Sequence, residues 1–126
     1  SWQIDIPVPW QAVDLEYCVE ITQPESVGAL HLSSYRKPDG MIDGAEAREQ
    51  FESGCPAGAV IRIAKCGDYA GYWAEYTDPL ANTYWREWII YCRESLLFVS
   101  YTCDHGDEKF EAPVAAGLLQ TLQCRV

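Results

Sequence analysis

The sequence predicts an α+β protein in which an antiparallel β-sheet meander of about six strands is flanked by two helices. Two long aromatic and β-branched runs, residues 83–92 and 96–103, flank a short polar break and are typical of the arms of a β-hairpin. Shorter runs of alternating apolar and polar residues recur between turn residues elsewhere in the chain. Near the C-terminus, apolar residues recur four positions apart, which is typical of an amphipathic helix.

The composition favours a single globular domain over residues 1–126. Hydrophobic residues make up 48% of the chain and charged residues 22%, and both fractions are ordinary for a folded domain. The formal net charge of −10 at pH 7 disfavours nucleic acid and anionic membranes as partners. No apolar run approaches the length that spans a membrane.

Six cysteines are present, and we expect them to be free thiols in a reducing, cytoplasmic setting. Cys18, Cys66, Cys92 and Cys103 lie in or at the ends of predicted strands, where cysteine behaves as a small apolar residue. A domain of this size does not need disulfides to be stable. No CxxC pair occurs, so the sequence predicts no structural zinc site, and it offers no cofactor motif.

The first third of the chain predicts a hairpin. Pro7 and Pro9 cannot donate to a strand ladder, so any strand in residues 2–10 is expected to be short or to lie at an edge. Residues 15–22 alternate apolar and polar side chains and predict a half-exposed strand. After a turn, residues 28–35 predict the second arm.

A short helix is predicted over residues 44–52. Asp43, with Glu46 three residues later, resembles a capping box, and Gly54 suits the end of the helix. The apolar stripe of this segment is thin, so we expect the helix to lie on the surface, anchored by Phe51.

The second half of the chain predicts four strands and a final helix. The strands are expected at residues 59–66, 69–77, 83–92 and 96–103. Alternation in the last two strands puts Ile89 and Ile90 on opposite faces, and likewise Phe98 and Leu97, with the remaining side chains alternating in the same way. Neither face is clearly polar, so this hairpin is expected in the middle of a sheet that is covered on both faces. Gly71 permits a bulge or a close approach of another strand. The final helix is expected to bury Phe110, Val114, Leu118 and Leu122.

The residues that could carry chemistry do not form a recognised catalytic motif. Cys103 and His105 could form a nucleophilic pair, or a metal site with Asp104 and Asp107, but a polar strand-to-helix connection explains this segment better. His31 lies within a predicted strand and is expected to be solvated or hydrogen-bonded rather than catalytic. The sequence therefore predicts a protein that is not an enzyme.

Two segments carry a resemblance to a known fold family. GALHLSSYRKPDG, residues 28–40, precedes a helix, and YWREWIIYCRESLLFVSYTC, residues 84–103, precedes the final amphipathic helix. This order resembles the PsbP-like fold, which includes the extrinsic photosystem II subunit, a yeast Ran-binding import factor and adaptor chaperones of type VI secretion effectors. Small acidic immunity proteins of contact-dependent toxin systems have sequences of the same general kind. The resemblance implies an α/β/α sandwich and a role in binding protein, and it assigns no functional residue.

We therefore predict a non-catalytic protein-binding module, an immunity protein or secretion-effector adaptor that occludes a basic partner protein. An acidic surface would steer such a partner, and the carboxylates expected to do so are Glu46, Glu49 and Glu52. Exposed aromatic residues commonly anchor interfaces, and those expected here are Tyr72, Trp73 and Tyr76. The alternative is a carrier that holds a small molecule or lipid in an aromatic-lined cavity between sheet and helix.

Overall fold

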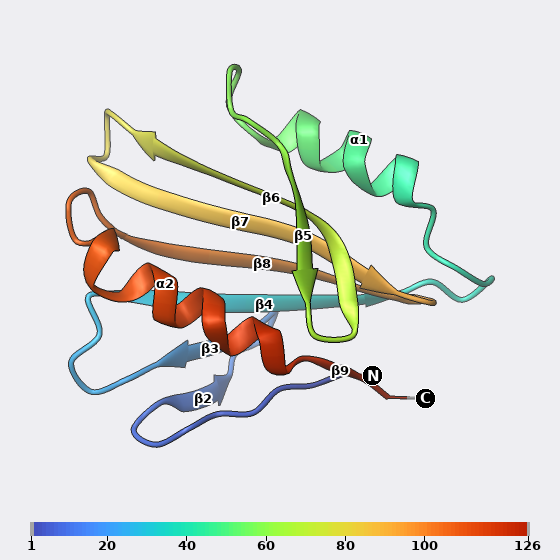
Figure 1. The fold of residues 1–126 in the computed structure, drawn as a ribbon, viewed down its shortest axis with the longest axis horizontal. Coiled ribbons are helices and arrows are strands. Elements are labelled where there is room, and N and C mark those ends of the chain that lie inside the picture. Colours follow the sequence, from blue (N-terminus) through green and yellow to red (C-terminus); the bar gives the residue numbers. More distant parts are fainter. Residues whose placement is uncertain (1, 126) are drawn as a thin grey trace.

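The structure is a computed structural model that describes residues 2–125. Within these residues, seven strands form an antiparallel sheet that lies between helix α1 and helix α2, and two further short strands pair with each other (Figure 1). The predicted α+β class is therefore confirmed. Both helices in the described part of the chain are too short to cross a membrane.

The strands do not follow one meander. Their order in the main sheet is β2-β3-β4-β8-β7-β6-β5. Two runs of consecutive strands are joined where β4 pairs with β8, and α1 carries the chain from β4 to β5 at the far edge. The elements are β1 (Trp2–Gln3), β2 (Gln11–Asp14), β3 (Val19–Thr22), β4 (Gly28–Arg36), α1 (Gly44–Gly54), β5 (Arg62–Cys66), β6 (Tyr69–Asp78), β7 (Thr83–Cys92), β8 (Ser95–Asp104), α2 (Glu108–Leu118), the 3-10 turn η1 (Leu119–Thr121) and β9 (Gln123–Cys124).

The N-terminal strands differ from the prediction in number and position. Strand β2 was not expected, and the strand predicted over residues 15–22 begins only at Val19. Leu15 donates its backbone N–H to the carbonyl of Cys18, at 2.8 Å, so these residues turn the chain between β2 and β3. Alternation of apolar and polar residues alone does not distinguish such a turn from a strand.

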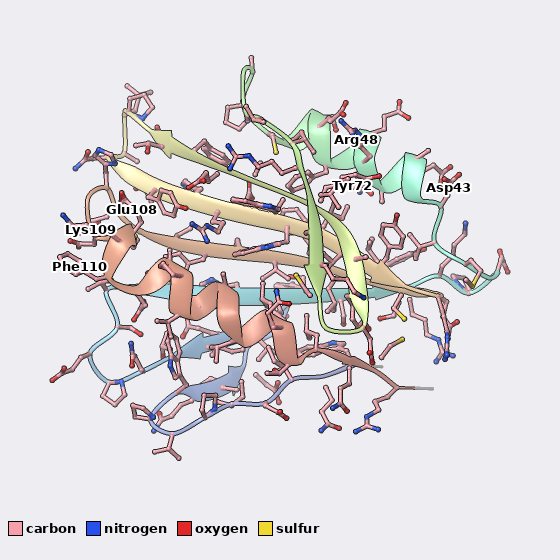
Figure 2. The ribbon with its side chains drawn as sticks, viewed as in Figure 1. Asp43, Arg48, Tyr72, Glu108, Lys109 and Phe110 are labelled. Carbon is pink, nitrogen blue, oxygen red and sulfur yellow. The ribbon has the colours of Figure 1, made fainter. Side chains whose placement is uncertain are left out.

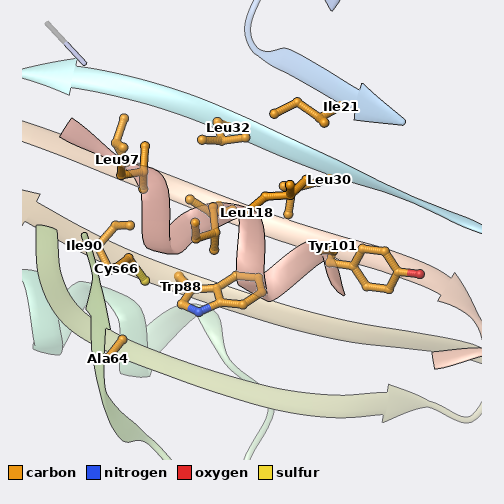
Figure 3. Packing of buried hydrophobic residues seen from close by; sticks show 14 of the residues in the cluster. Ile21, Leu30, Leu32, Ala64, Cys66, Trp88, Ile90, Leu97, Tyr101 and Leu118 are labelled. Atoms are coloured by element: carbon orange, nitrogen blue, oxygen red, sulfur yellow. The ribbon is translucent and has the colours of Figure 1, made fainter. Parts of the chain in front are cut away.

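The larger core lies between the sheet and α2 (Figure 3). Alternate residues of the central strands supply it, including Leu32 of β4, Leu97 and Tyr101 of β8, and Trp88 and Ile90 of β7. All of these side chains are almost completely removed from water. The predicted division of the β7–β8 hairpin into two faces is therefore confirmed.

The predicted buried face of the final helix is half right. Leu118 and Leu122 are buried as expected, whereas Phe110 and Val114 are 67% and 52% exposed, and Glu111, Ala112 and Ala115 take their place against the sheet. Two alanines let the helix axis approach the sheet closely, and the Glu111 carboxylate is hydrogen-bonded on its buried side. A buried glutamate within the contact face is the reason that the apolar spacing was misleading in the first half of the helix.

A smaller core lies under α1. Ala47 and Phe51 of the helix are buried against Ala74 of β6 and Ile89 of β7. Asp43 caps the helix by accepting a hydrogen bond from the Ala45 N–H at 2.9 Å, as predicted. Because α1 packs chiefly on β6 and β7, it covers only part of this face, and the sheet is less completely shielded on this side than the sequence suggested.

Candidate functional site

A groove runs beside α1, over the part of the sheet that the helix leaves open. Its volume is about 630 Å³, and aromatic or aliphatic side chains make up most of its lining. The lining residues are Ser33, Ser34, Tyr35, Gln50, Phe51, Ile89, Leu96 and Phe98. We call this hollow the α1 groove.

Phe98 is an open apolar side chain in the α1 groove. Strand pairing places it directly between Ser33 of β4 and Ile89 of β7. Its ring meets the ring of Phe51 edge-on, with centroids 6.5 Å apart and an interplanar angle of 63°. Phe51 is only 2% exposed, whereas Phe98 is 41% exposed. The groove therefore presents the open ring of Phe98, held in place by the buried ring of Phe51, and the exposed ring of Tyr35.

A row of polar side chains borders the groove on the same face of the sheet. Pairing across four neighbouring strands aligns Glu20 with His31, His31 with Ser100, and Ser100 with Glu87. His31 Nε2 lies 3.0 Å from Glu20 Oε2, in agreement with the prediction that this histidine is hydrogen-bonded. Carboxylates thus stand at both ends of the row.

Glu87 is the buried member of this polar row. It is 9% exposed, and its Oε1 accepts a hydrogen bond of 2.7 Å from the Tyr76 hydroxyl. Burial raises the pKa of the Glu87 carboxyl, and the hydrogen bond from Tyr76 opposes this shift. The Tyr76 ring also stacks on Trp85, with centroids 6.4 Å apart. The border of the groove therefore contains a desolvated carboxyl group on a rigid strand.

We expect Glu87→Gln to become progressively more stable relative to the parent chain as the pH rises. Because the pKa of Glu87 is raised in the folded state, the folded chain binds more protons than the unfolded chain between the two pKa values, so the carboxylate costs stability above that window. Urea unfolding between about pH 4 and about pH 8 measures the difference in unfolding free energy. Glu46→Gln, at an exposed carboxylate, is the matched control. A glutamine advantage that shrinks with rising pH would contradict the assignment.

The three predicted carboxylates are all exposed on α1, but they face different sides of the helix. Glu46 lies one turn before Gln50, which lines the groove, so Glu46 is on the groove side. Glu52 is on the other side, where it accepts a hydrogen bond of 2.7 Å from Arg48. The Arg48 guanidinium in turn lies over the Tyr72 ring, 5.2 Å from its centroid (Figure 2). Glu49 is exposed between these two sides.

The three predicted aromatic anchors do not form one cluster. Tyr72 packs with the core under α1, whereas Trp73, the next residue, points to the opposite face of β6 and packs with the α2 core. Two guanidinium groups, from Arg62 and Arg86, each lie 5.2 Å from the centroid of Trp73. All three aromatic residues are partly buried, and their role as partner contacts stays a prediction.

Sequence reasoning missed Phe98 and Glu87 as site residues. Both belong to strands with apolar residues on both faces, so neither strand pattern marks the side that is open. One feature of the sequence could have indicated the open surface, namely the narrow apolar face of α1. A helix that buries only Ala47 and Phe51 cannot cover one face of a broad sheet, so part of the apolar surface on that face had to remain open.

The structure does not bring Cys103 and His105 together as a nucleophilic pair. Cys103 is buried in the α2 core. His105 is exposed in the turn after β8, where its Nδ1 lies 3.4 Å from the Thr77 hydroxyl. Among residues 2–125, no group of three or more His, Cys, Asp or Glu side chains is arranged to hold a metal ion.

Comparison with known proteins gives structural neighbours only. No family model and no curated protein matches the sequence. A crystal structure of a protein from Bacteroides thetaiotaomicron matches 99% of this chain with a TM-score of 0.69 and 17% identity, and this chain spans 45% of its length. LpqN, involved in cell envelope biogenesis of Mycobacterium tuberculosis, matches 98% of this chain and 84% of its own, with a TM-score of 0.55 and 14% identity. These similarities show a shared fold.

Proposed function

We propose that this protein is a non-catalytic binding module whose α1 groove receives a basic partner protein. The observation that carries the proposal is the open ring of Phe98, which is backed by the buried ring of Phe51 in an apolar groove. Exposed aromatic rings on a rigid support are the side chains that contribute most to protein interfaces. The partner is expected to place an apolar side chain against Phe98.

Charge complementarity supports a basic partner. The chain carries a net charge of −10, and Glu46 and Glu20 flank the groove from α1 and from the sheet. Such a field raises the association rate of a positively charged protein and falls off with added salt. We propose that the protein occludes such a basic surface as an immunity protein or a secretion-effector adaptor, and that it has a PsbP-like relationship. A cytoplasmic location suits the six free thiols.

The test compares two exposed phenylalanines on opposite faces. Tagged parent chain, Phe98→Ala and Phe110→Ala are used to capture proteins from the native host, and the recovered proteins are quantified by mass spectrometry. A true partner is retained by the parent chain and by Phe110→Ala, because Phe110 lies on α2, away from the groove (Figure 2). With the purified partner, Phe98→Ala is expected to weaken binding by about 30-fold. Equal binding by both variants would exclude the groove.

The electrostatic part of the proposal predicts a salt-dependent association rate. We expect the rate constant to fall by about tenfold or more between low salt and about 0.5 M salt, with little change in the dissociation rate. Glu46→Gln is expected to reduce the salt dependence, whereas Glu25→Gln, in the turn between β3 and β4, serves as the control. An association rate that is indifferent to ionic strength would remove steering from the mechanism.

The size of the groove favours a carrier function as the second candidate. A volume of about 630 Å³ with an apolar lining lies within the range of small-molecule sites. Titration with a fluorescent fatty-acid analogue tests this alternative. Saturable one-to-one binding that Phe98→Ala weakens and Phe110→Ala leaves unchanged would favour the carrier over the protein-binding module.

A further inference from the structure

Two cysteines that are distant in sequence lie in contact at the C-terminal end of the fold. Cys92 is the last residue of β7, and Cys124 is the last residue of β9. The sulfur of Cys124 lies 3.7 Å from the carbonyl oxygen of Cys92. Both side chains are partly buried and pack against the α2 core. This contact joins the chain end to the middle of the sheet.

The backbone holds both cysteines in place. Cys92 pairs with Ser95 across the tight turn between β7 and β8. Cys124 pairs with Trp2 of β1, and its N–H donates to the Asp68 carboxylate at 2.9 Å. Since each cysteine is fixed by its own strand, the contact between the Cys124 sulfur and Cys92 is a property of the fold. The two thiols also lie within hydrogen-bonding reach of each other.

We propose that Cys92 and Cys124 are a reversible disulfide site that reacts with a low-molecular-weight disulfide such as oxidised glutathione. The other four cysteines lie on separate elements, with Cys18 beside β3, Cys55 at the end of α1, Cys66 in β5 and Cys103 in β8. Cys66 and Cys103 are also buried. Among residues 2–125, Cys92 and Cys124 are the two cysteines for which the structure shows the side chain of one in contact with the other.

The reaction balances as two thiol–disulfide exchanges. The thiolate of Cys124 attacks one sulfur of oxidised glutathione, which forms a mixed disulfide and releases one glutathione thiolate. The thiolate of Cys92 then attacks the Cys124 sulfur and releases the second glutathione. The two cysteines are oxidised, one glutathione disulfide is reduced to two thiols, and the released thiolates take up the protons that the cysteines lose.

The order of the two steps follows from the surroundings of Cys92. Desolvation, and then the neighbouring Cys124 thiol, raise the pKa of Cys92 to about 11, so its thiolate is scarce near neutral pH. Cys124 is therefore assigned the first attack and Cys92 the resolving step. The resulting bridge would close a loop of about 30 residues that contains β8 and α2, and closing a loop of this length stabilises the folded state.

Peptide mapping of the intact protein tests the site. The reduced chain is incubated with oxidised glutathione at about pH 8, free thiols are alkylated after unfolding, and the digest is analysed by mass spectrometry. The expected product contains one crosslink, between Cys92 and Cys124, and four alkylated cysteines. The oxidised protein is also expected to have a Tm higher by at least about 5 °C, and dithiothreitol should reverse this change.

Single substitutions separate the two roles. Cys92→Ser is expected to accumulate a glutathione adduct on Cys124, because the resolving thiol is missing, whereas Cys18→Ser should form the crosslink like the parent chain. A crosslink that uses any other cysteine, no crosslink after prolonged oxidation, or a persistent adduct on Cys124 of the parent chain would each overturn the proposal. The mapping of the unmodified sequence decides the result even where a variant folds poorly.

Discussion

Glu111→Ala is expected to lower the free energy of unfolding by about 3–5 kcal/mol. Glu111 is 3% exposed and lies on the face of α2 that contacts the sheet. Its Oε1 accepts hydrogen bonds from the Tyr101 hydroxyl at 2.9 Å and the Gly28 N–H at 3.1 Å, and its Oε2 accepts one from Gln23 at 2.8 Å. Alanine leaves these donors without an acceptor, and a buried donor that loses its partner costs its full desolvation.

Equilibrium unfolding in urea measures this effect. Glu111→Gln is the matched control because it keeps the size of the side chain and an acceptor oxygen, and we expect it to cost less than half as much as alanine. Tyr101→Phe removes one donor and is expected to cost about 1–2 kcal/mol. A loss below about 1 kcal/mol for Glu111→Ala would show that the helix is held to the sheet by its alanines and leucines alone.

Gly71→Ala is the second substitution with a large expected effect. A Cβ at this position of β6 would lie 2.1 Å from the carbonyl oxygen of Ile89 and 2.9 Å from the Cα of Ile90, both on β7. These are backbone atoms of a central strand, so they cannot turn aside as a flexible side chain would. We expect a loss of at least about 3 kcal/mol, at the upper end of the cost of overpacking.

Gly117→Ala provides the control for this substitution. The position lies in α2, and a Cβ there meets no atom within 4 Å. Alanine favours a helix over glycine, so this variant should be more stable by about 0.5–1 kcal/mol. Thermal unfolding followed by circular dichroism compares the two variants. A Gly71→Ala protein as stable as its parent would mean that β6 and β7 separate without cost at this point.

Local sequence patterns were sufficient to predict the central hairpin, α1 and the fold class. Asp43 caps α1 and Phe51 anchors it, as expected, because both signals act within a few residues. Alternation in the β7–β8 hairpin assigned each side chain to the correct face for the same reason. Strand order could not be deduced, since the β4–β8 pair depends on contacts between segments that are distant in sequence.

The candidate site was predicted less well because it depends on what is left uncovered. Phe98 and Leu97 have the same apolar character, and the helices decide which of them is open to water: α2 covers Leu97, whereas α1 leaves Phe98 partly exposed. The buried face of α2 depends likewise on Glu111, whose partners are Gln23 in the β3–β4 turn and Gly28 at the start of β4, 88 and 83 residues earlier. From the sequence alone a glutamate is predicted to be exposed, because its hydrogen-bond partners in the fold are not known.

The pairing of β4 with β8 sets the order in which the sheet can assemble. Each of the strands β5 to β8 pairs with the strand next to it in the sequence, so these pairs can form by closing short loops, which is fast. The β4–β8 ladder instead joins residues about 60 to 75 positions apart, from Arg36 with Ser95 to Gly28 with Cys103. Closing this seam is therefore the slow, entropically costly step, and until it closes the apolar edge of β8 is available to a neighbouring molecule. During synthesis the β4–β8 pair can form only late, because β8 is the last strand of the main sheet to be synthesised.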